Sequence, residues 1–329
     1  MIPLLQVENL EKKFINEITG AQRIRNFFYA NKIPARILHA LSDVSLTLAS
    51  GEVLGVVGES GCGKSTLGRI IAGILPASNG SVYFNGQPVH AHAASHHLNV
   101  QMVFQNPYAS LNPRMRIDHS IGDAAIYHKI IDKSEAEAYT SELLQQVGLE
   151  HAYLRRYPHQ LSGGQRQRIA IARALALKPK LIVCDEAVSA LDVSVQAQVL
   201  NLLMDLRERN NLSYLFISHN LAVVEYMADR VAVMYLGRVV ELATTETLFD
   251  QAQHPYTQAL IADAPRIDTK PIHHHPIPGE LPSPLAPPAG CAFHPRCPKA
   301  TKRCKIERPL LKETTPMHFS ACHLNEKLC

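Results

Sequence analysis

Gly58-Glu59-Ser60-Gly61-Cys62-Gly63-Lys64-Ser65-Thr66 is the stretch of this sequence that decides its fold. It fits the pattern G-x-x-x-x-G-K-[ST], in which backbone N–H groups cradle phosphates, the lysine reaches the β- and γ-phosphates and the hydroxyl ligates Mg²⁺. The apolar run 53–57 predicts a strand before the pattern, and residues 67–72 predict a helix whose N-terminus favours anions. This context disfavours the alternative, a plain glycine-rich turn. We therefore expect a nucleotide site on an α/β core.

A second pair of glycines opens another expected helix. Leu161-Ser162-Gly163-Gly164-Gln165 precedes residues 166–176, which have a helical pattern. Glycines at a helix start leave N–H groups that can meet a phosphate. The ordinary glycine start of a surface helix is the alternative. Because the chain already has one phosphate loop, the second site suggests ATP held between two chains.

From residue 5 to residue 250, the motifs resemble in order and spacing those of the ATP-binding subunits of ABC transporters. The 161–165 segment resembles the signature sequence of that family. Residues 181–186 resemble its Walker B strand, where apolar residues end in two acids, as a buried strand with chemistry at its carboxyl end should. The resemblance implies that Asp185 supports Mg²⁺ and that Glu186 orients or deprotonates the attacking water.

The same resemblance implies roles for four further positions. Gln105 corresponds to the glutamine that senses the metal and the membrane partner, and residues 189–192 correspond to the D-loop. His219 corresponds to the switch histidine near the γ-phosphate, and Phe14 to the aromatic residue that stacks on adenine. Residues 162–165 would complete the ATP site of a partner chain. Each signal is weak alone, and the joint order carries the interpretation.

Two positions depart from the family pattern. Ala187 follows the catalytic acid where a proline is usual, and Asn220 follows the switch histidine where an aspartate is usual. Neither change replaces a reacting group, so we expect the chain to hydrolyse ATP.

Composition disfavours other classes of protein. The 33 basic and 29 acidic residues leave a net charge of +4, which does not argue for nucleic-acid binding. No apolar run approaches the about 18 residues of a membrane span, and the N-terminus lacks a signal-peptide pattern. Membrane contact is therefore expected through partners. A soluble ABC protein of DNA repair or translation is the alternative, and a single phosphate loop without heptads counts against it.

Alternating strand and helix patterns predict an α/β core, with antiparallel strands in the first fifty residues, a strand at 81–84 and mostly helix in residues 115–180. The resemblance implies a P-loop NTPase core with an antiparallel β subdomain and a helical signature subdomain, followed by a small cysteine-containing C-terminal region. We expect the ATPase domain to cover residues 1–254 and the C-terminal region to cover residues 255–329.

The C-terminal region begins with nine prolines in residues 255–288. Proline at this density excludes long helices and central strands. Apolar residues such as Tyr256 and Leu281 are spaced through the segment, so we expect an ordered, extended wrap on the main domain rather than a flexible tail.

Four cysteines then follow with the spacing C-x5-C-x6-C-x17-C, at Cys291, Cys297, Cys304 and Cys322. Thiols at this density suggest a metal or a cluster rather than packing. A disulfide framework needs an oxidising compartment, zinc usually takes closer cysteine pairs, and a [4Fe–4S] cluster tolerates varied spacing.

Residues 254–260, 279–284 and 290–293 resemble the C-terminal region of dipeptide and oligopeptide importer ATPases, most of all the dipeptide permease subunits. That resemblance implies a [4Fe–4S] cluster on the four cysteines. It also implies an ATPase, peripheral on the cytoplasmic face of the bacterial inner membrane, that pairs with a paralogous ATPase subunit, two membrane permeases and an extracytoplasmic binding protein. Related systems move nickel, haem or antimicrobial peptides, so the substrate stays open.

Residues 105–113 hold two prolines and two asparagines, which predict a loop. We expect Tyr108 and Leu111 in this loop to dock on a cytoplasmic helix of the permease. The alternative is that both side chains pack inward on the helical subdomain.

Overall fold

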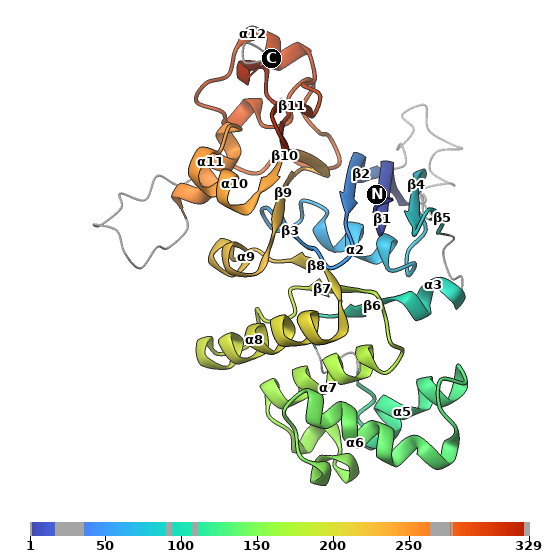
Figure 1. The fold of residues 1–329 in the computed structure, drawn as a ribbon. Helices are drawn as coiled ribbons and strands as arrows, with labels where there is room; N and C mark the ends of the chain where they lie inside the picture. Colours follow the sequence, from blue (N-terminus) through green and yellow to red (C-terminus); the bar gives the residue numbers. More distant parts are fainter. Residues whose placement is uncertain are drawn as a thin grey trace, which may run out of the picture.

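The computed structural model describes residues 2–16, 36–89, 94–106, 111–263, 277 and 279–325. Figure 1 shows their arrangement. The strands are β1 (Leu5–Asn16), β2 (Arg36–Leu48), β3 (Val53–Val57), β4 (Asn79–Phe84), β5 (Gln87–Pro88), β6 (Val100–Val103), β7 (Leu181–Asp185), β8 (Ser213–Ile217), β9 (Arg230–Tyr235), β10 (Arg238–Thr244), β11 (Lys312–Thr315) and β12 (His318–Ser320). The α-helices are α2 (Lys64–Ile71), α3 (Ala94–Asn99), α5 (Ile117–Tyr127), α6 (Ala136–Gln146), α7 (Gly163–Leu175), α8 (Val193–Asn210), α9 (Leu221–Met227), α10 (Thr245–Gln251), α11 (Pro255–Ala262) and α12 (Lys302–Ile306). Short 3₁₀ turns are η1 (Lys133–Glu135), η2 (His151–Arg155), η3 (Pro158–Gln160), η4 (His294–Arg296) and η5 (His323–Asn325).

The central sheet has the order β11-β12-β10-β9-β3-β8-β7-β6. Strands β9, β3, β8, β7 and β6 run parallel to one another, whereas β10 pairs antiparallel with β9. Every residue of β3, β7 and β8 is buried. Parallel strands covered on both faces need continuous apolar sequence, which is what these strands have. The expected α/β core is therefore present, and the phosphate loop leaves the carboxyl end of β3.

A second, antiparallel sheet has the order β2-β1-β4-β5. Its inner face shares one cluster of buried side chains with α2 and the central sheet, including Leu5, Leu48, Leu67 and Leu54. Helix α2 lies between the two sheets (Figure 1). The antiparallel strands expected in the first fifty residues are confirmed, and the strand expected at 81–84 pairs with them as β4.

Helices α5, α6 and α7 form a lobe at the end of the molecule opposite the C-terminal region (Figure 1). This confirms that residues 115–180 are mostly helical. Leu111 belongs to the buried cluster of this side and is 3% exposed. The interpretation of Leu111 as a docking residue is therefore wrong, because its apolar side chain fills the core. Tyr108 lies outside the described residues.

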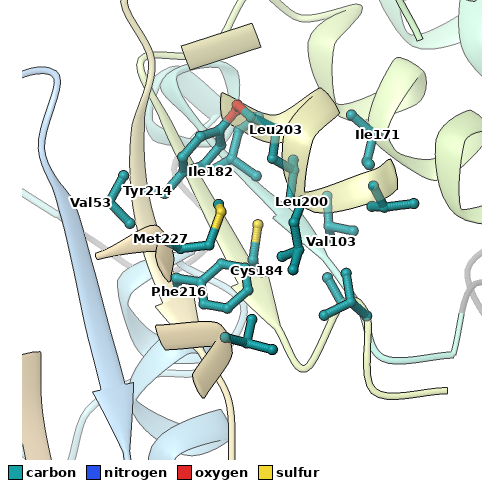
Figure 2. Close-up of a cluster of buried hydrophobic side chains, with 14 of the residues drawn as sticks. Val53, Val103, Ile171, Ile182, Cys184, Leu200, Leu203, Tyr214, Phe216 and Met227 are labelled. Atoms are coloured by element: carbon teal, nitrogen blue, oxygen red, sulfur yellow. The ribbon is translucent and has the colours of Figure 1, made fainter. Parts of the chain in front are cut away.

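The core behind the parallel strands packs β7 and β8 against α8 and α9. Figure 2 shows Phe216 and Cys184 facing Leu200 and Met227 in this cluster. The one polar atom that Tyr214 carries into the core is satisfied, because its hydroxyl donates to the Leu203 carbonyl at 2.9 Å. Strands β7 and β8 are thus held on a well-packed support.

The C-terminal region continues the central sheet, because β12 pairs antiparallel with β10 and β11 pairs with β12. The buried carboxylate of Glu241 on β10 accepts a hydrogen bond from His318 Nε2 on β12 at 2.7 Å. Strand pairing and a buried polar contact therefore both join this region to the ATPase core.

The expectation of an extended wrap from residue 255 is wrong for residues 255–262, which form α11. Pro255 occupies the first helical position, where its missing N–H costs nothing, and the His254 ring accepts a hydrogen bond from the Tyr256 N–H. Much of the proline-rich segment lies outside the described residues. Within the described ranges, no helix is long and apolar enough to cross a membrane.

Candidate functional site

A pocket of about 430 Å³ opens where the phosphate loop meets the antiparallel sheet. It brings together side chains that are far apart in the sequence. Its lining residues are Phe14, Leu38, Ala40, Ser60, Gly61, Gly63, Lys64, Ser65, Thr66, Gln105, Glu186 and Pro284. The size suits a nucleotide-sized ligand. Phe14 is 39% exposed and lies opposite Leu38 in the pairing of β1 and β2, so its ring is available for stacking.

Two glycines of the phosphate loop occupy positions where no other residue fits. Gly58 has φ of 146°, and a Cβ there would lie 2.2 Å from the Met234 carbonyl oxygen. Gly63 has φ of 105°, and a Cβ would lie 2.4 Å from the Ala40 carbonyl oxygen. The loop can curl against β2 and β9 only because these side chains are missing.

The Lys64 side chain is 4% exposed and lies along the inside of the loop. Its ammonium donates to the carbonyl oxygens of Gly58 at 2.8 Å and Glu59 at 3.1 Å. Cys62 is 1% exposed, and burial raises the pKa of its thiol. The lysine charge is therefore held among the loop carbonyls, whereas the cysteine is a packing residue.

Ser65 and Asp185 meet although 120 positions separate them. The Ser65 hydroxyl donates to Asp185 Oδ1 at 2.8 Å. Asp185 is 6% exposed, and this burial raises the pKa of its carboxyl, while the Ser65 hydrogen bond and the Arg69 charge act in the opposite direction. A hydroxyl and a carboxylate at one point are oxygen ligands of the kind that Mg²⁺ takes.

Glu186 follows at the end of β7 with φ of 50°, in the left-handed region that non-glycine residues seldom adopt. Its carboxylate is 17% exposed and lies 3.3 Å from His219 Nδ1. Gln105 Nε2 donates to Ser189 Oγ at 3.2 Å, and Ser189 Oγ donates to the Glu186 carbonyl at 3.0 Å. Four residues assigned from sequence motifs thus meet at Glu186, His219 at its carboxylate and Ser189 with Gln105 at its backbone carbonyl.

The signature residues Ser162, Gly163, Gly164 and Gln165 do not line this pocket. Ser162 caps α7 by accepting from the Gln165 N–H at 3.3 Å, and Gln165 Oε1 accepts from the Ser162 N–H. A Cβ at Gly164 would lie 2.5 Å from Val195 Cγ1, so the bare backbone permits close packing on the start of α8.

The two departures from the family pattern have local explanations. The Asn220 side chain accepts from the Ala222 N–H at 3.1 Å and so caps α9, a role that asparagine and aspartate share. Ala187 is 2% exposed and packs in the core. Neither side chain displaces a group of the site.

Cys291, Cys297, Cys304 and Cys322 line one small cavity in the C-terminal region. The pKa of Cys322 is raised to about 11, mainly by burial and to a smaller extent by the three neighbouring thiols. All four are free cysteines. Among the described residues, no group of three or more His, Cys, Asp or Glu side chains has an arrangement that could hold a metal ion.

Three residues near the nucleotide pocket were not predicted from the sequence. Pro284 lines the pocket, and its carbonyl accepts from the His39 N–H at 3.2 Å. Arg296 and Tyr256 contact Glu59 of the phosphate loop. No motif in the C-terminal region indicates these contacts with Glu59, and Arg296 lies 237 positions from it in the sequence.

Comparison with known proteins agrees with this geometry. Residues 41–189 match the ABC transporter family, and residues 240–304 match the oligopeptide/dipeptide transporter C-terminal region. The probable peptide ABC transporter ATP-binding protein y4tS of Sinorhizobium fredii is 47% identical, over 98% of this chain and 90% of its own length. The dipeptide transport ATP-binding protein DppF of Haemophilus influenzae is 49% identical, over 86% and 88%.

Solved structures show the same fold. CbiO1 of Clostridium perfringens, part of the ABC transporter complex cbiONQ, has a TM-score of 0.62 at 26% identity over 76% of this chain and 91% of its own. The ATP-binding cassette MJ0796, in a dimeric post-hydrolysis state with ADP and Pi, has a TM-score of 0.62 at 26% identity, over 73% and 98%. The chain therefore belongs to the ABC ATPases, within the family of ATP-binding subunits of peptide ABC transporters.

Proposed function

We propose that this chain is the ATP-hydrolysing subunit of an importer that moves dipeptides or oligopeptides across the cytoplasmic membrane. The observation that carries the proposal is the presence, in one chain, of the assembled nucleotide pocket and of residues 240–304 that match the peptide-transporter C-terminal region. The relatives y4tS and DppF are named for peptide and dipeptide transport.

ATP would lie with its adenine against Phe14 and its phosphates in the loop from Gly58 to Thr66. Loop N–H groups, the N-terminus of α2 and the Lys64 ammonium would stabilise the charge that spreads over the γ-phosphate in the transition state. Glu186 would orient or deprotonate the attacking water. His219 lies 3.3 Å from the Glu186 carboxylate and would hold Glu186 and the water next to the γ-phosphate.

The oxygen atoms of Ser65, Asp185 and Gln105 suit Mg²⁺, and the short contact between Ser65 and Asp185 supports this assignment. When bound, Mg²⁺ neutralises charge on the β- and γ-phosphates. Gln105 contacts Ser189, which contacts Glu186, so Gln105 would report the state of the metal site to the catalytic acid.

Two chains would share each ATP. Ser162, Gly163, Gly164 and Gln165 stand outside this chain's own pocket, at the capped start of α7, where backbone N–H groups can meet the γ-phosphate bound by a partner. We propose a paralogous ATPase subunit as that partner. Closure on ATP and opening after hydrolysis would then be a population shift driven by contacts across the interface.

The other partners would be two transmembrane permease subunits and an extracytoplasmic substrate-binding protein, with this chain peripheral on the cytoplasmic side. Nothing in the charge balance favours nucleic acid as a partner. Contact with the membrane would come through the permeases. We place the ATPase domain at residues 1–254 and the C-terminal region at residues 255–329.

We also propose a [4Fe–4S] cluster on Cys291, Cys297, Cys304 and Cys322. The four thiols line one cavity, and burial raises the pKa of Cys291, Cys297 and Cys322. Buried thiolates at this density need a compensating cation, which an iron cluster supplies.

The transport proposal is tested with the chain assembled with its permeases and binding protein in lipid vesicles. A mixture of dipeptides and longer peptides should stimulate ATP hydrolysis and enter the vesicles, and Glu186→Gln should stop both. Uptake of nickel or haem with no response to any peptide would overturn the peptide assignment while leaving the ATPase assignment intact.

The cluster proposal is tested on protein purified without oxygen. It should be brown and hold about four irons per chain. Cys297→Ser or Cys304→Ser should bleach it, whereas Cys184→Ala, at a buried strand cysteine that does not line the cavity, should keep the colour. Stoichiometric zinc without iron would contradict the cluster.

A further inference from the structure

We propose that Arg296 and Tyr256 are positioning residues for the phosphate loop and that they act through Glu59. Both come from the C-terminal region, outside the motifs of the ATPase domain. The inference rests on the ATP-hydrolysing function proposed above and extends it, because it makes the C-terminal region part of the nucleotide site.

The side chain of Glu59 is clamped by Arg296. Arg296 Nη1 donates to Glu59 Oε2 at 2.7 Å, and Nη2 donates to Oε1 at 3.0 Å. The exposed fractions are 6% for the Arg296 side chain and 26% for that of Glu59. A paired, mostly buried fork of this kind is among the stronger and more directional contacts in proteins. It therefore fixes the orientation of Glu59, not only its position.

The backbone of Glu59 is held from two directions. Its N–H donates to the Tyr256 hydroxyl at 2.9 Å, and its carbonyl accepts from Lys64 Nζ at 3.1 Å. A shift of Glu59 would therefore move a carbonyl that contacts the phosphate-binding lysine. This contact is the route by which residues outside the pocket can alter ATP affinity.

The two positioning residues stand on a rigid base. Tyr235, Tyr256 and Phe293 pack ring against ring, with centroids 4.7 to 5.4 Å apart, and each is at most 1% exposed. Arg296 also donates to the Tyr235 hydroxyl at 3.4 Å. Because Tyr235 ends β9, next to β3, this cluster joins the C-terminal region to the strand beside the phosphate loop.

The same segment connects Glu59 to the cysteine cavity. Arg296 closes the η4 turn, and Cys291 and Cys297 on either side of that turn both line the cavity. Phe293 lines the cavity as well. A cluster that holds both cysteines would hold η4, and with it the Arg296 fork. Loss of the cluster should therefore weaken ATP binding at a distance.

The inference is tested by measuring ATP affinity with the full-length chain at known iron content. Arg296→Met should weaken binding by at least about fivefold, a usual size for coupling between sites. Arg296→Lys should recover part of the loss, because one charge-assisted contact remains. Tyr256→Phe should weaken binding in the same direction.

Arg303→Met is the matched control. Arg303 makes a similar fork to Glu307 in the same region, with Nε and Nη2 distances of 2.6 and 2.8 Å, but that pair is exposed and does not contact the phosphate loop. The ATP affinity of the Arg303→Met variant should stay within about twofold of that of the wild-type chain. Equal affinities in Arg296→Met and Arg303→Met would overturn the inference.

A double-mutant cycle checks the route through Glu59. If Arg296 acts through Glu59, Glu59→Gln with Arg296→Met should bind ATP no more weakly than the weaker single variant. Independent, additive losses would show that Arg296 only stabilises the C-terminal region. In the assembled transporter, Arg296→Met should raise KM for ATP more than it lowers kcat, which a general loss of folded protein would not do.

Cys304→Ser separates this inference from the cluster proposal. If it loses iron and also weakens ATP binding, the cavity and the nucleotide site are coupled. If it loses iron with unchanged affinity, the coupling fails. If the wild-type chain holds no iron, the cluster proposal fails, and the Arg296 variants still decide whether the C-terminal region positions the phosphate loop.

Discussion

The backbone conformation of Glu186 allows the contribution of its carboxylate to ATP hydrolysis to be measured separately from the effect of its strained backbone on protein stability. We compare Glu186→Ala with Glu186→Gly, neither of which has a carboxylate. Both should reduce steady-state ATP hydrolysis by about 10²–10⁴-fold, the usual contribution of a general base. Because both keep the N–H that donates to the Ile217 carbonyl at 3.0 Å, the two differ mainly in backbone freedom.

The stability difference follows from φ of 50° at this position. An L-residue in the left-handed region costs about 1–2 kcal/mol, whereas glycine adopts it freely. Glycine loses about 0.5–1 kcal/mol through the entropy of the unfolded chain. The difference leaves Glu186→Gly more stable than Glu186→Ala by up to about 1.5 kcal/mol, the reverse of the ordinary order.

Urea unfolding of the two variants gives this difference directly. Ala197→Gly, at an exposed position inside α8, is the control and should cost about 1 kcal/mol. If Glu186→Gly is less stable than Glu186→Ala by a similar amount, residue 186 is not held in the left-handed region and the reasoning is refuted.

Three further predictions follow from single contacts. Leu111→Ala should lower the free energy of unfolding by about 2–5 kcal/mol, because it empties a core position, and unchanged stability with lost transport would restore the docking interpretation. Gly164→Ala should lower ATP hydrolysis and Val195→Ala should partly restore it, since the added Cβ meets Val195 Cγ1 at 2.5 Å; no restoration would place the defect elsewhere. Burial lowers the pKa of His96, whose Nε2 lies 2.7 Å from the Ile71 carbonyl, so its stabilising contribution is full above the unfolded pKa near 6.5 and is lost as pH falls. His96→Gln should therefore flatten the fall in stability below pH 6.5 in pH-dependent urea unfolding, and an unchanged slope would exclude His96 as its source.

Local patterns predicted the elements that local physics decides. A phosphate-binding loop and carboxylates at the end of a strand both need fixed, short spacing in the sequence. They can therefore be recognised within a few residues, as at the run 53–57, the glycines 58 and 63, and the acids 185 and 186. The structure places Ser65, Gln105, Glu186 and Phe14 around one pocket as that order of motifs predicted.

Contacts between distant segments could not be predicted in this way. The proline count suggested an extended segment at residue 255, yet Pro255 is the first residue of a helix because His254 caps it. Leu111 lies in a loop pattern, and only the packing of the helical lobe shows that it is buried. Arg296 belongs to a short turn between cysteines, and its partner, Glu59, lies 237 positions away. Only the folded central sheet shows that the two are in contact.

The pairing of β12 with β10 has a consequence for shortened forms of this chain. Glu241 and Leu242 of β10 face Ser320 and Phe319, so the tail covers one side of a strand whose other side already pairs with β9. Without the tail, β10 would become an open edge with unpaired N–H and C=O groups, and the buried Glu241 carboxylate would lose its contact with His318. Such an edge accepts strands from other molecules. A truncated chain would therefore be prone to self-association through β10, and covering this edge is a second consequence of the tail's pairing.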